Sequence, residues 1–256
     1  MPISVQVVGS RATRTTHPLV LEHFREFFSA AISKSMEIEN PFIWKTKAEV
    51  IGSIVQRGCG ALIKHTVSCT RTYDITKLHT HCGCCSQCLD RRFAVLAANA
   101  TDYDPVEMYK VELLTGERHK DHDKTMAESY VRTALELRDM GELAFFGRFG
   151  GEIARVLTCF PSYGADDVGR RVLDLHQRHA RAIGDVLKAA VEMHSAELVN
   201  RSLPSSSLLM MTVAPDGLPA VAGIGNHRDP LKTWMDKAEA ETDEHKKIRV
   251  FVESSG

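Results

Sequence analysis

The stretch HTHCGCCSQCLDRR, residues 79–92, contains four of the seven cysteines in this 256-residue chain. Within it, Cys82, Cys85 and Cys88 are spaced C-x2-C-x2-C, and Cys69 lies thirteen residues before Cys82. Zinc held by four thiolates needs two ligand-bearing segments that come together into a tetrahedron. The spacing therefore predicts a structural zinc site with these four cysteines as its ligands.

Two local features favour this choice of ligands. Gly83 lets the backbone turn so that its amides can point at sulfur. Cys85 and Cys88 can share one face of the helix that CSQCLDRRFAVLAA is predicted to begin, and the positive N-terminus of that helix favours thiolates. If Cys85 points inward, its neighbour Cys84 points away, so Cys84 is the alternative ligand at this step.

Other uses of the cysteines match the sequence less well. An iron–sulfur cluster would share the C-x2-C-x2-C run, yet the proline-flanked fourth cysteine of a ferredoxin-type run is absent. Redox or nucleophilic thiols are a further alternative. Disulfides are disfavoured because the chain start has no signal-peptide apolar region, which predicts a cytoplasmic protein with reduced thiols. Arg91 and Arg92 are expected to offset the negative charge of a zinc tetrathiolate.

The composition is that of a globular protein without a strongly charged partner. The chain has 32 Lys and Arg against 33 Asp and Glu, a formal net charge of −1 and a pI near 6.9. This balance predicts no extended basic field for nucleic acid or for an anionic membrane. No apolar run approaches the roughly 18 residues that a membrane-spanning helix needs. We therefore expect neither a membrane nor a nucleic acid as a direct partner.

Residues 1–104 are predicted to form part of an α/β fold. Short strands are expected at 4–9 and 61–68, where short runs with apolar and β-branched residues occur. Pro18 opens a helix, as is common for a proline in the first turn. The segment TKAE, which begins at Thr46, has the pattern of a capping box and predicts the start of a second helix.

Residues 105–214 are predicted to form a mainly helical extension. Helices are expected roughly over residues 108–114, 125–148, 152–158 and 166–200. The last of these carries three histidines among charged neighbours, which predicts a solvated helix face rather than metal ligands: His176, His179 and His194. Residues 215–256 are rich in Pro, Gly and charge and are expected to be loop or disordered, apart from one short strand near the end.

Several motifs occur in a particular order along the chain. They are PFIWKTKAE (residues 41–49), the dipeptide Ser68-Cys69, CGCCSQC (residues 82–88) and Arg91. Together they resemble the 7-cyano-7-deazaguanine synthase (QueC) family over about residues 1–100. TRTTHP (residues 13–18) and NPFIWKTKAEV (residues 40–50) are similar to the QueC-like proteins of bacterial anti-phage operons such as Qat.

The resemblance implies a chemistry and a set of residues. Family members activate 7-carboxy-7-deazaguanine with ATP by adenylation and convert it with ammonia, through an amide, to a nitrile. In the defence relatives, the activated deazapurine is instead joined to a protein amine. Carried over, the four cysteines are ligands of a structural zinc near the purine pocket. The resemblance also gives three cations that could face a carboxylate or phosphate: Arg14, Lys47 and Arg91. It assigns no catalytic residue here.

One family element is missing from this sequence. Family members begin with a strand and the loop SGGxDS, whose backbone amides hold the ATP phosphates, and no such segment occurs here. We therefore expect a partial PP-loop fold, related to the adenine-nucleotide α-hydrolases, with an exposed sheet edge. It would be a split subunit, a truncated product or a fragment. Its expected partners are a chain with the PP-loop half or further copies of itself, a deazapurine and a protein acceptor. The alternative is a non-catalytic, zinc-stabilised protein-interaction module.

Overall fold

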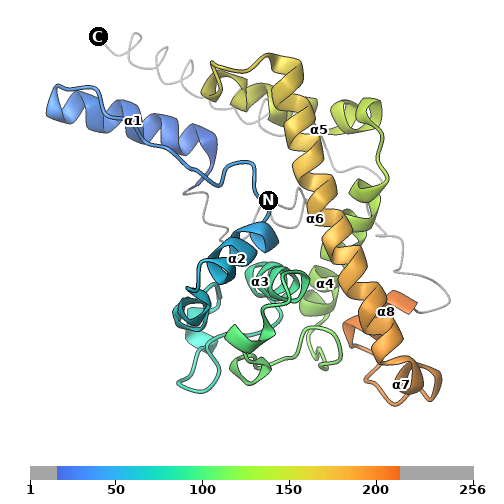
Figure 1. Cartoon of the computed structure of the whole chain (residues 1–256). Coiled ribbons are helices and arrows are strands. Elements are labelled where there is room, and N and C mark those ends of the chain that lie inside the picture. The colour runs from blue at the N-terminus through green and yellow to red at the C-terminus, as the bar shows by residue number, and fades with distance from the viewer. Residues whose placement is uncertain (1–15, 214–256) are drawn as a thin grey trace, which may run out of the picture. The chain divides into compact units, whose positions relative to one another are not determined.

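The computed structural model describes residues 16–213, which Figure 1 draws as the coloured ribbon. The α-helices are α1 (Pro18–Ile32), α2 (Lys47–Gln56), α3 (Ser86–Ala97), α4 (Asp121–Arg138), α5 (Glu142–Val156), α6 (Ala165–Met193), α7 (Ser195–Val199) and α8 (Leu208–Val213). Short 3-10 helices lie at η2 (Gly60–His65), η3 (Thr72–Asp74), η4 (Thr101–Tyr103), η5 (Val106–Met108) and η6 (Leu157–Cys159). None of the helices in this part of the chain is long and apolar enough to cross a membrane.

Residues 16–213 contain no β-strand, and a single parallel bridge joins His81 to Tyr109. The strand predicted at 61–68 is wrong, because its first part is the 3-10 helix η2. Within residues 16–213 no neighbouring strand offers a hydrogen-bonding edge, and the apolar side chain of Ile63 instead packs into a core with Ile51 and Val95. The α/β class is therefore not confirmed. The strands predicted at 4–9 and near the C-terminus lie outside the described residues.

The first residues of α1 and α2 were predicted correctly from local sequence signals. α2 begins as predicted: the Thr46 side chain accepts a hydrogen bond from the Glu49 amide, and the Glu49 carboxylate accepts one from the Thr46 amide. The chain leaves this helix through Gly58, whose φ of 72° is a left-handed conformation that glycine adopts without strain. α1 begins at Pro18, also as predicted.

Helix α3 lies at the centre of the fold. It contacts α2, α4 and α6, and both its apolar and its basic side chains are buried. Phe93 stacks on Tyr130 of α4 with ring centroids 5.5 Å apart, and Leu89 is fully buried. The same helix carries Cys88 in its first turn, so the packing of α3 also positions the cysteine-rich segment.

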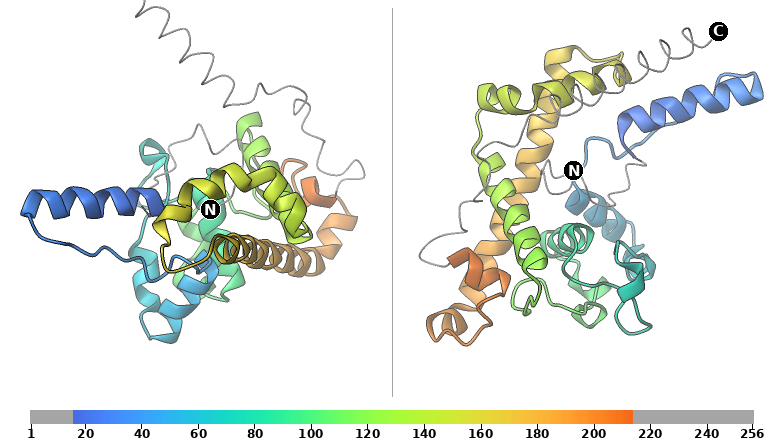
Figure 2. Two further views of the ribbon diagram at one scale, coloured as in Figure 1. Left: turned by 90° about the horizontal axis from the view of Figure 1, so that it is seen from above. Right: turned by 180° about the vertical axis from the view of Figure 1, so that it is seen from behind.

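The helical extension is built mainly from α4, α5 and α6, and α4 packs along α6 (Figure 2). Its helices differ from those predicted. The segment 108–114 is not a helix, because only its first residue belongs to the 3-10 helix η5 and the rest lies outside any helix. The single helix predicted at 125–148 is instead divided between α4 and α5, and Gly141 is the N-cap of α5. α6 follows the expected apolar periodicity and ends at Met193, before a separate short α7.

A polar network joins four helices across the boundary between α3 and the extension. Asp90 of α3 accepts hydrogen bonds from Lys47 of α2 at 2.7 Å and from the Tyr130 hydroxyl of α4 at 2.9 Å. The same hydroxyl lies 3.3 Å from Nε2 of His179 on α6. These contacts, which we call the interhelix network, give α2, α3, α4 and α6 a fixed mutual arrangement.

Two of the three histidines on α6 are not where we expected them. His176 is 5% exposed and lies near the ring of Phe145, and His179 is half-buried in the interhelix network. The prediction of a solvated face was wrong for His176 and His179, because both lie on the side of α6 that packs against other helices. His194 is half-exposed and pairs with Glu197.

Burial of His176 predicts a loss of stability in acid. Burial lowers its pKa from 6.5 to about 3, so the folded state excludes a proton that the unfolded chain binds below pH 6.5. Stability from this group is complete above pH 6.5 and falls as the pH is lowered. At pH 5 the loss should be about 2 kcal/mol, from 1.36 kcal/mol per pKa unit.

Urea unfolding of His176→Leu at pH 7 and pH 5, with saturating zinc, tests this expectation. The variant should lose about 2 kcal/mol less than the wild-type protein between the two pH values. His23→Leu is the matched control because the His23 side chain is 74% exposed. Equal losses in the wild-type and His176→Leu proteins would contradict the assignment.

Candidate metal centre

The four predicted zinc ligands meet in one place, which we call the cysteine cluster. One Sγ atom from each lies within 4.8 Å of the others: Cys69, Cys82, Cys85 and Cys88. The sulfurs of Cys82 and Cys88 are 3.9 Å apart. A tetrahedron with zinc–sulfur bonds of about 2.3 Å places its sulfurs about 3.8 Å apart. The cluster therefore has the size of a single four-coordinate ion, and its cysteines are positioned to bind a metal such as zinc.

The compact spacing also favours one ion over an iron–sulfur cluster. A four-iron cluster binds each thiolate through a different iron, which sets the sulfurs farther apart than a single ion does. All four cysteines are buried, and thiolates are soft ligands that suit zinc. The donor set and the enclosure thus fit a closed, structural site with no open coordination position.

The backbone around Gly83 shapes the cluster. Gly83 has φ 77°, and a Cβ atom at this position would lie 1.8 Å from the carbonyl oxygen of Val111. Only glycine fits here, on both counts. The turn aims the amides of Cys84 and Cys85 at the sulfur of Cys82, at 3.4 and 3.3 Å. This is the role predicted for Gly83.

Cys84 is buried but is not part of the cluster. It lies beside Asp123 of α4, and burial together with this carboxylate raises the pKa of the Cys84 thiol to about 11. Cys85 is the N-cap of α3 and faces the other ligands, as the helix argument predicted. The choice of Cys85 over Cys84 therefore agrees with the geometry.

The thiols of Cys82, Cys85 and Cys88 influence one another's protonation. Hydrogen bonds with Cys82 and Cys88 lower the pKa of Cys85, whereas hydrogen bonds with Cys82 and Cys85, together with burial, raise the pKa of Cys88. Buried sulfurs this close favour one thiolate at the expense of the next, because like charges repel strongly away from water. A divalent cation removes this repulsion, which is the physical reason that such a cluster suits a metal.

The three predicted substrate cations have different surroundings. Lys47 is one-third exposed and bonds to Asp90 in the interhelix network. Arg91 is 4% exposed, and its donors go to protein oxygens: Nε to Asp104 at 2.8 Å, Nη1 to the Thr66 carbonyl at 3.1 Å and Nη2 to the Ile63 carbonyl at 2.7 Å. Arg14 lies outside the described residues. Substrate contact stays a prediction for all three.

Sequence reasoning missed the acidic residues that hold this site together. Asp104 is fully buried and accepts bonds from Arg91, Arg92 and the hydroxyl of Tyr109. Asp123 pairs with Arg71, which lies two residues after Cys69. The Asp-Pro step at residue 104 marked a change in character along the chain, and nothing in the sequence pattern linked it to distant arginines.

Residues 16–99 match the family model described as queuosine biosynthesis protein QueC. This region is QueC-like. It runs from α1 through α3, contains the whole cysteine cluster, and covers about a third of the 256 residues. No curated protein and no solved structure matches the chain. The QueC-like resemblance is thereby confirmed, and the link to anti-phage operons stays a prediction.

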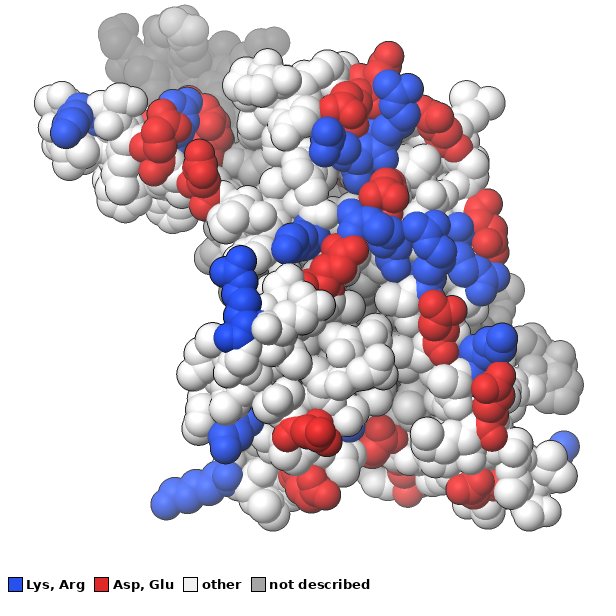
Figure 3. All heavy atoms as spheres, viewed as in Figure 1, with Lys and Arg blue, Asp and Glu red and all other residues white. Residues whose placement is uncertain are grey.

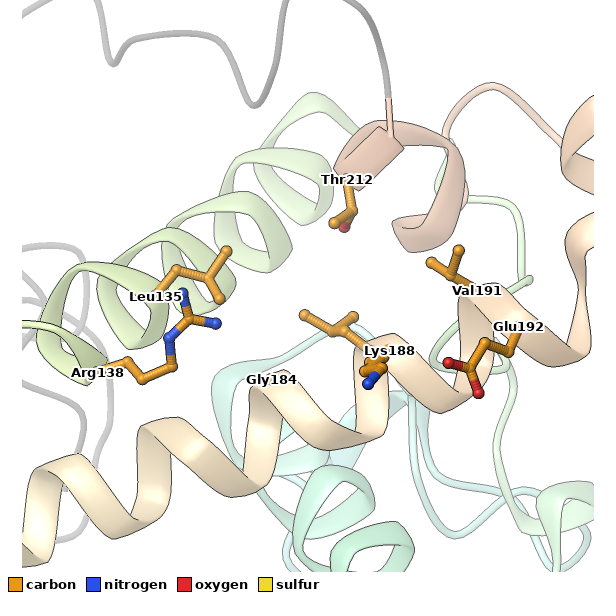
Figure 4. Close-up of a pocket in the computed structure, with 8 residues that line it drawn as sticks. Leu135, Arg138, Gly184, Lys188, Val191, Glu192 and Thr212 are labelled. Atoms are coloured by element: carbon orange, nitrogen blue, oxygen red, sulfur yellow. The ribbon is translucent and has the colours of Figure 1, made fainter.

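A groove of about 330 Å³ lies away from the cysteine cluster, between α4, α6 and α8 (Figure 4). Leu135 and Arg138 of α4 face Lys188 of α6 across it, and Thr212 of α8 closes one side. The face drawn in Figure 3 shows Lys and Arg along α6 with acidic side chains between them. That mixture agrees with the near-neutral net charge of the chain.

Protein purified without added metal should contain one zinc per chain by elemental analysis. Cys85→Ser should lose the metal because a cluster ligand is removed, whereas Cys84→Ser should keep it. The two positions are adjacent and both buried, so each variant is the control for the other. Iron in place of zinc would contradict the assignment of the ion. The reverse pattern of the two variants would move the ligand by one residue.

Proposed function

We propose that the QueC-like region is the zinc-bearing part of an ATP-dependent enzyme that acts on 7-carboxy-7-deazaguanine. The observation that carries this proposal is the coincidence of two findings in one region of the chain. The family match at residues 16–99 includes all four members of the cysteine cluster, and those sulfurs lie within 4.8 Å of one another, close enough to share one metal ion. The reduced thiols that zinc requires favour the cytoplasm as its location.

The proposed chemistry begins with the carboxylate of the deazapurine. Attack of this carboxylate on the α-phosphate of ATP forms an acyl-adenylate and releases pyrophosphate. Ammonia then displaces AMP to give the amide. A second ATP adenylates the amide oxygen and releases pyrophosphate, and departure of that oxygen with AMP, together with loss of the two protons on nitrogen, gives the nitrile. A protein amine in place of ammonia would give a conjugate instead. Zinc takes no part in these steps and supports the chain from Cys82 to α3 beside the substrate.

Lys47 is the predicted cation best placed to meet a substrate anion. Its ammonium group has three N–H donors, and Asp90 is the one acceptor that the described residues provide. With one-third of its side chain exposed, Lys47 can add a bond to a carboxylate or phosphate. Arg91, by contrast, is buried and supports the fold of the site through Asp104.

A complete reaction requires a phosphate-binding loop from elsewhere. The sequence lacks SGGxDS, and phosphate binding depends on several converging backbone amides. We propose that a second polypeptide supplies this loop and that the present chain by itself does not activate the carboxylate. ATP is therefore a cofactor of the assembled enzyme.

Reconstitution with a polypeptide that carries SGGxDS tests this proposal. The chain alone should show no heat of ATP binding by calorimetry, and the mixture should release pyrophosphate only when 7-carboxy-7-deazaguanine is present. Lys47→Met should lower the affinity for the acid about tenfold or more, because a charge-assisted bond contributes about 1.5–3 kcal/mol. Lys45→Met is the control. Micromolar ATP binding by the isolated chain would refute the split-enzyme proposal.

A second candidate function is a non-catalytic interaction module, and the surface of α1 favours it. No residue of α1 is buried, and Phe24, Phe27 and Phe28 form a contiguous aromatic group on its surface. Phe27 is 64% exposed. An exposed apolar group of this kind is typical of a protein–protein contact. The SGGxDS polypeptide is the occupant that the enzyme proposal requires.

Substitution on α1 tests this contact, and pyrophosphate release by the complex separates the two candidates. Phe24→Glu with Phe28→Glu should abolish association with the SGGxDS polypeptide in sedimentation equilibrium, because two charges would be buried in the contact. Leu143→Glu on α5 is the control, since Leu143 is 89% exposed and lies on another helix. A complex that forms through α1 without pyrophosphate release would favour the interaction module. Unchanged association of the double variant would exclude α1 as the contact.

A further inference from the structure

Lys47 is the first member of a row of hydrogen-bonded side chains that reaches into the helical extension. Asp90 pairs with the Lys47 ammonium at 2.7 Å through Oδ2 and accepts a bond from the Tyr130 hydroxyl at 2.9 Å through Oδ1. That hydroxyl lies 3.3 Å from Nε2 of His179. Helices α3 and α6 each contact the other three helices of this interhelix network, which lie together in Figure 1. Tyr130 and His179 both lie beyond residue 99, where the family match ends.

The direction of each hydrogen bond follows from the donors that are present. The Asp90 carboxylate accepts only, so the single hydroxyl proton of Tyr130 is donated to Asp90. Burial raises the pKa of Tyr130 well above 10 and lowers the pKa of His179, so the phenol keeps its proton and the imidazole is neutral. The Tyr130 oxygen is then the acceptor of an N–H at Nε2 of His179. The network therefore fixes the tautomer of His179.

The aromatic rings hold the Tyr130 hydroxyl in place. Tyr130 stacks on Phe93 with ring centroids 5.5 Å apart, and the His179 ring meets it edge-on at 6.0 Å. Asp90 cannot turn its carboxylate without losing the bond at Oδ1. It therefore presents one oxygen to Lys47, whose ammonium keeps two N–H donors without an acceptor among residues 16–213.

Helix α6 also holds the backbone on both sides of Lys47. Arg178, the neighbour of His179, donates to the Trp44 carbonyl at 2.9 Å and pairs with Glu49. Glu49 in turn accepts the Thr46 amide in the capping box of α2. The start of α2 and the side chain of Lys47 are thus fixed by two adjacent residues of α6, one acting on the backbone and the other through Tyr130 and Asp90.

We infer that Tyr130 and His179 are positioning residues for the substrate cation Lys47, so that the helical extension forms part of the substrate site. The inference rests on the proposed function, in which Lys47 meets an anion of the substrate. Without the Tyr130 hydroxyl, Oδ1 of Asp90 is free to take a second N–H of the ammonium and to draw it away from the substrate. His179 acts one step farther out, because it holds the oxygen of Tyr130.

A double-mutant cycle in the reconstituted mixture tests this role, with the full-length, zinc-loaded chain and pyrophosphate release as the readout. Tyr130→Phe keeps the ring and removes the hydroxyl alone. It should raise KM for the acid about two- to tenfold, the factor that corresponds to one hydrogen bond, and leave kcat unchanged. In the Lys47→Met background the same substitution should have no further effect, because the positioned cation is gone. Tyr163→Phe, at a tyrosine that is 39% exposed, is the matched control and should change neither constant.

His179 supplies a second pair of variants, which decides the question if Tyr130→Phe does not fold. His179→Gln keeps an N–H donor close to the place of Nε2 and should retain the wild-type KM. His179→Leu has no donor and should raise KM. Helical content at saturating zinc checks that both variants are folded. Equal KM values for the Gln and Leu variants would overturn the inference.

The imidazole N–H signal of His179 reports the same contacts by NMR without any partner polypeptide. It should shift in Lys47→Met, because hydrogen bonds in one network polarise one another, and it should stay in place in Lys45→Met. An unmoved signal in Lys47→Met would overturn the inference whatever the mixture does.

The kinetic outcomes separate this inference from the proposed function. Additive KM effects of Tyr130→Phe and Lys47→Met would give Tyr130 a merely structural role and overturn the inference, while the contact of Lys47 with the substrate would stand. An unchanged KM in Lys47→Met would remove that contact and the inference with it. A mixture that releases no pyrophosphate would count against the proposed reaction, and the His179 signal would then decide the inference.

Discussion

The described fold depends on the meeting of four cysteine sulfurs. Cys69 reaches the cluster from a loop, and the other three ligands come from the turn and first residues of α3. No β-strand links these segments within residues 16–213, so contacts among the sulfurs and the packing of buried side chains hold the segments together in place of a sheet. A structural zinc contributes roughly 10–16 kcal/mol in apparent binding energy, comparable to the whole stability of an ordinary domain at about 5–15 kcal/mol.

Polar contacts extend this order from the cluster into the rest of the chain. Asp90 lies two residues after Cys88 and joins Lys47 to Tyr130 of the extension. On α6, Arg178 pairs with Glu49 of the α2 capping box and donates to the Trp44 carbonyl. The contact of Asp90 with Tyr130 and those of Arg178 with Glu49 and Trp44 cross from the QueC-like region to helices outside the family match. Movement of α6 or α4 would therefore disturb the segment that carries Lys47.

The parts that the sequence predicted were those decided by local chemistry. The capping box at Thr46, the turn at Gly83 and the grouping of the four cysteines each depend on a few neighbouring residues or on ligand spacing. The failures came from distant partners. Residues 61–68 have the composition of a strand but no strand to pair with in the described region, and His176 is buried by helix packing that its charged neighbours concealed. Likewise, no pattern near Arg118 indicates that its side chain is buried.

The contact between Gly83 and Val111 bears on how this protein can be shortened or recombined. The family match ends at residue 99, yet the carbonyl of Val111 lies against the turn that holds two of the cluster ligands. A gene fusion that exchanged the chain after residue 99 would replace Val111, which packs against the turn, and Tyr130, the partner of Asp90 on α4. The smallest transplantable piece must therefore continue through the linker into α4. The segment that matches the family model is therefore shorter than the segment needed to keep the contacts of the cysteine turn.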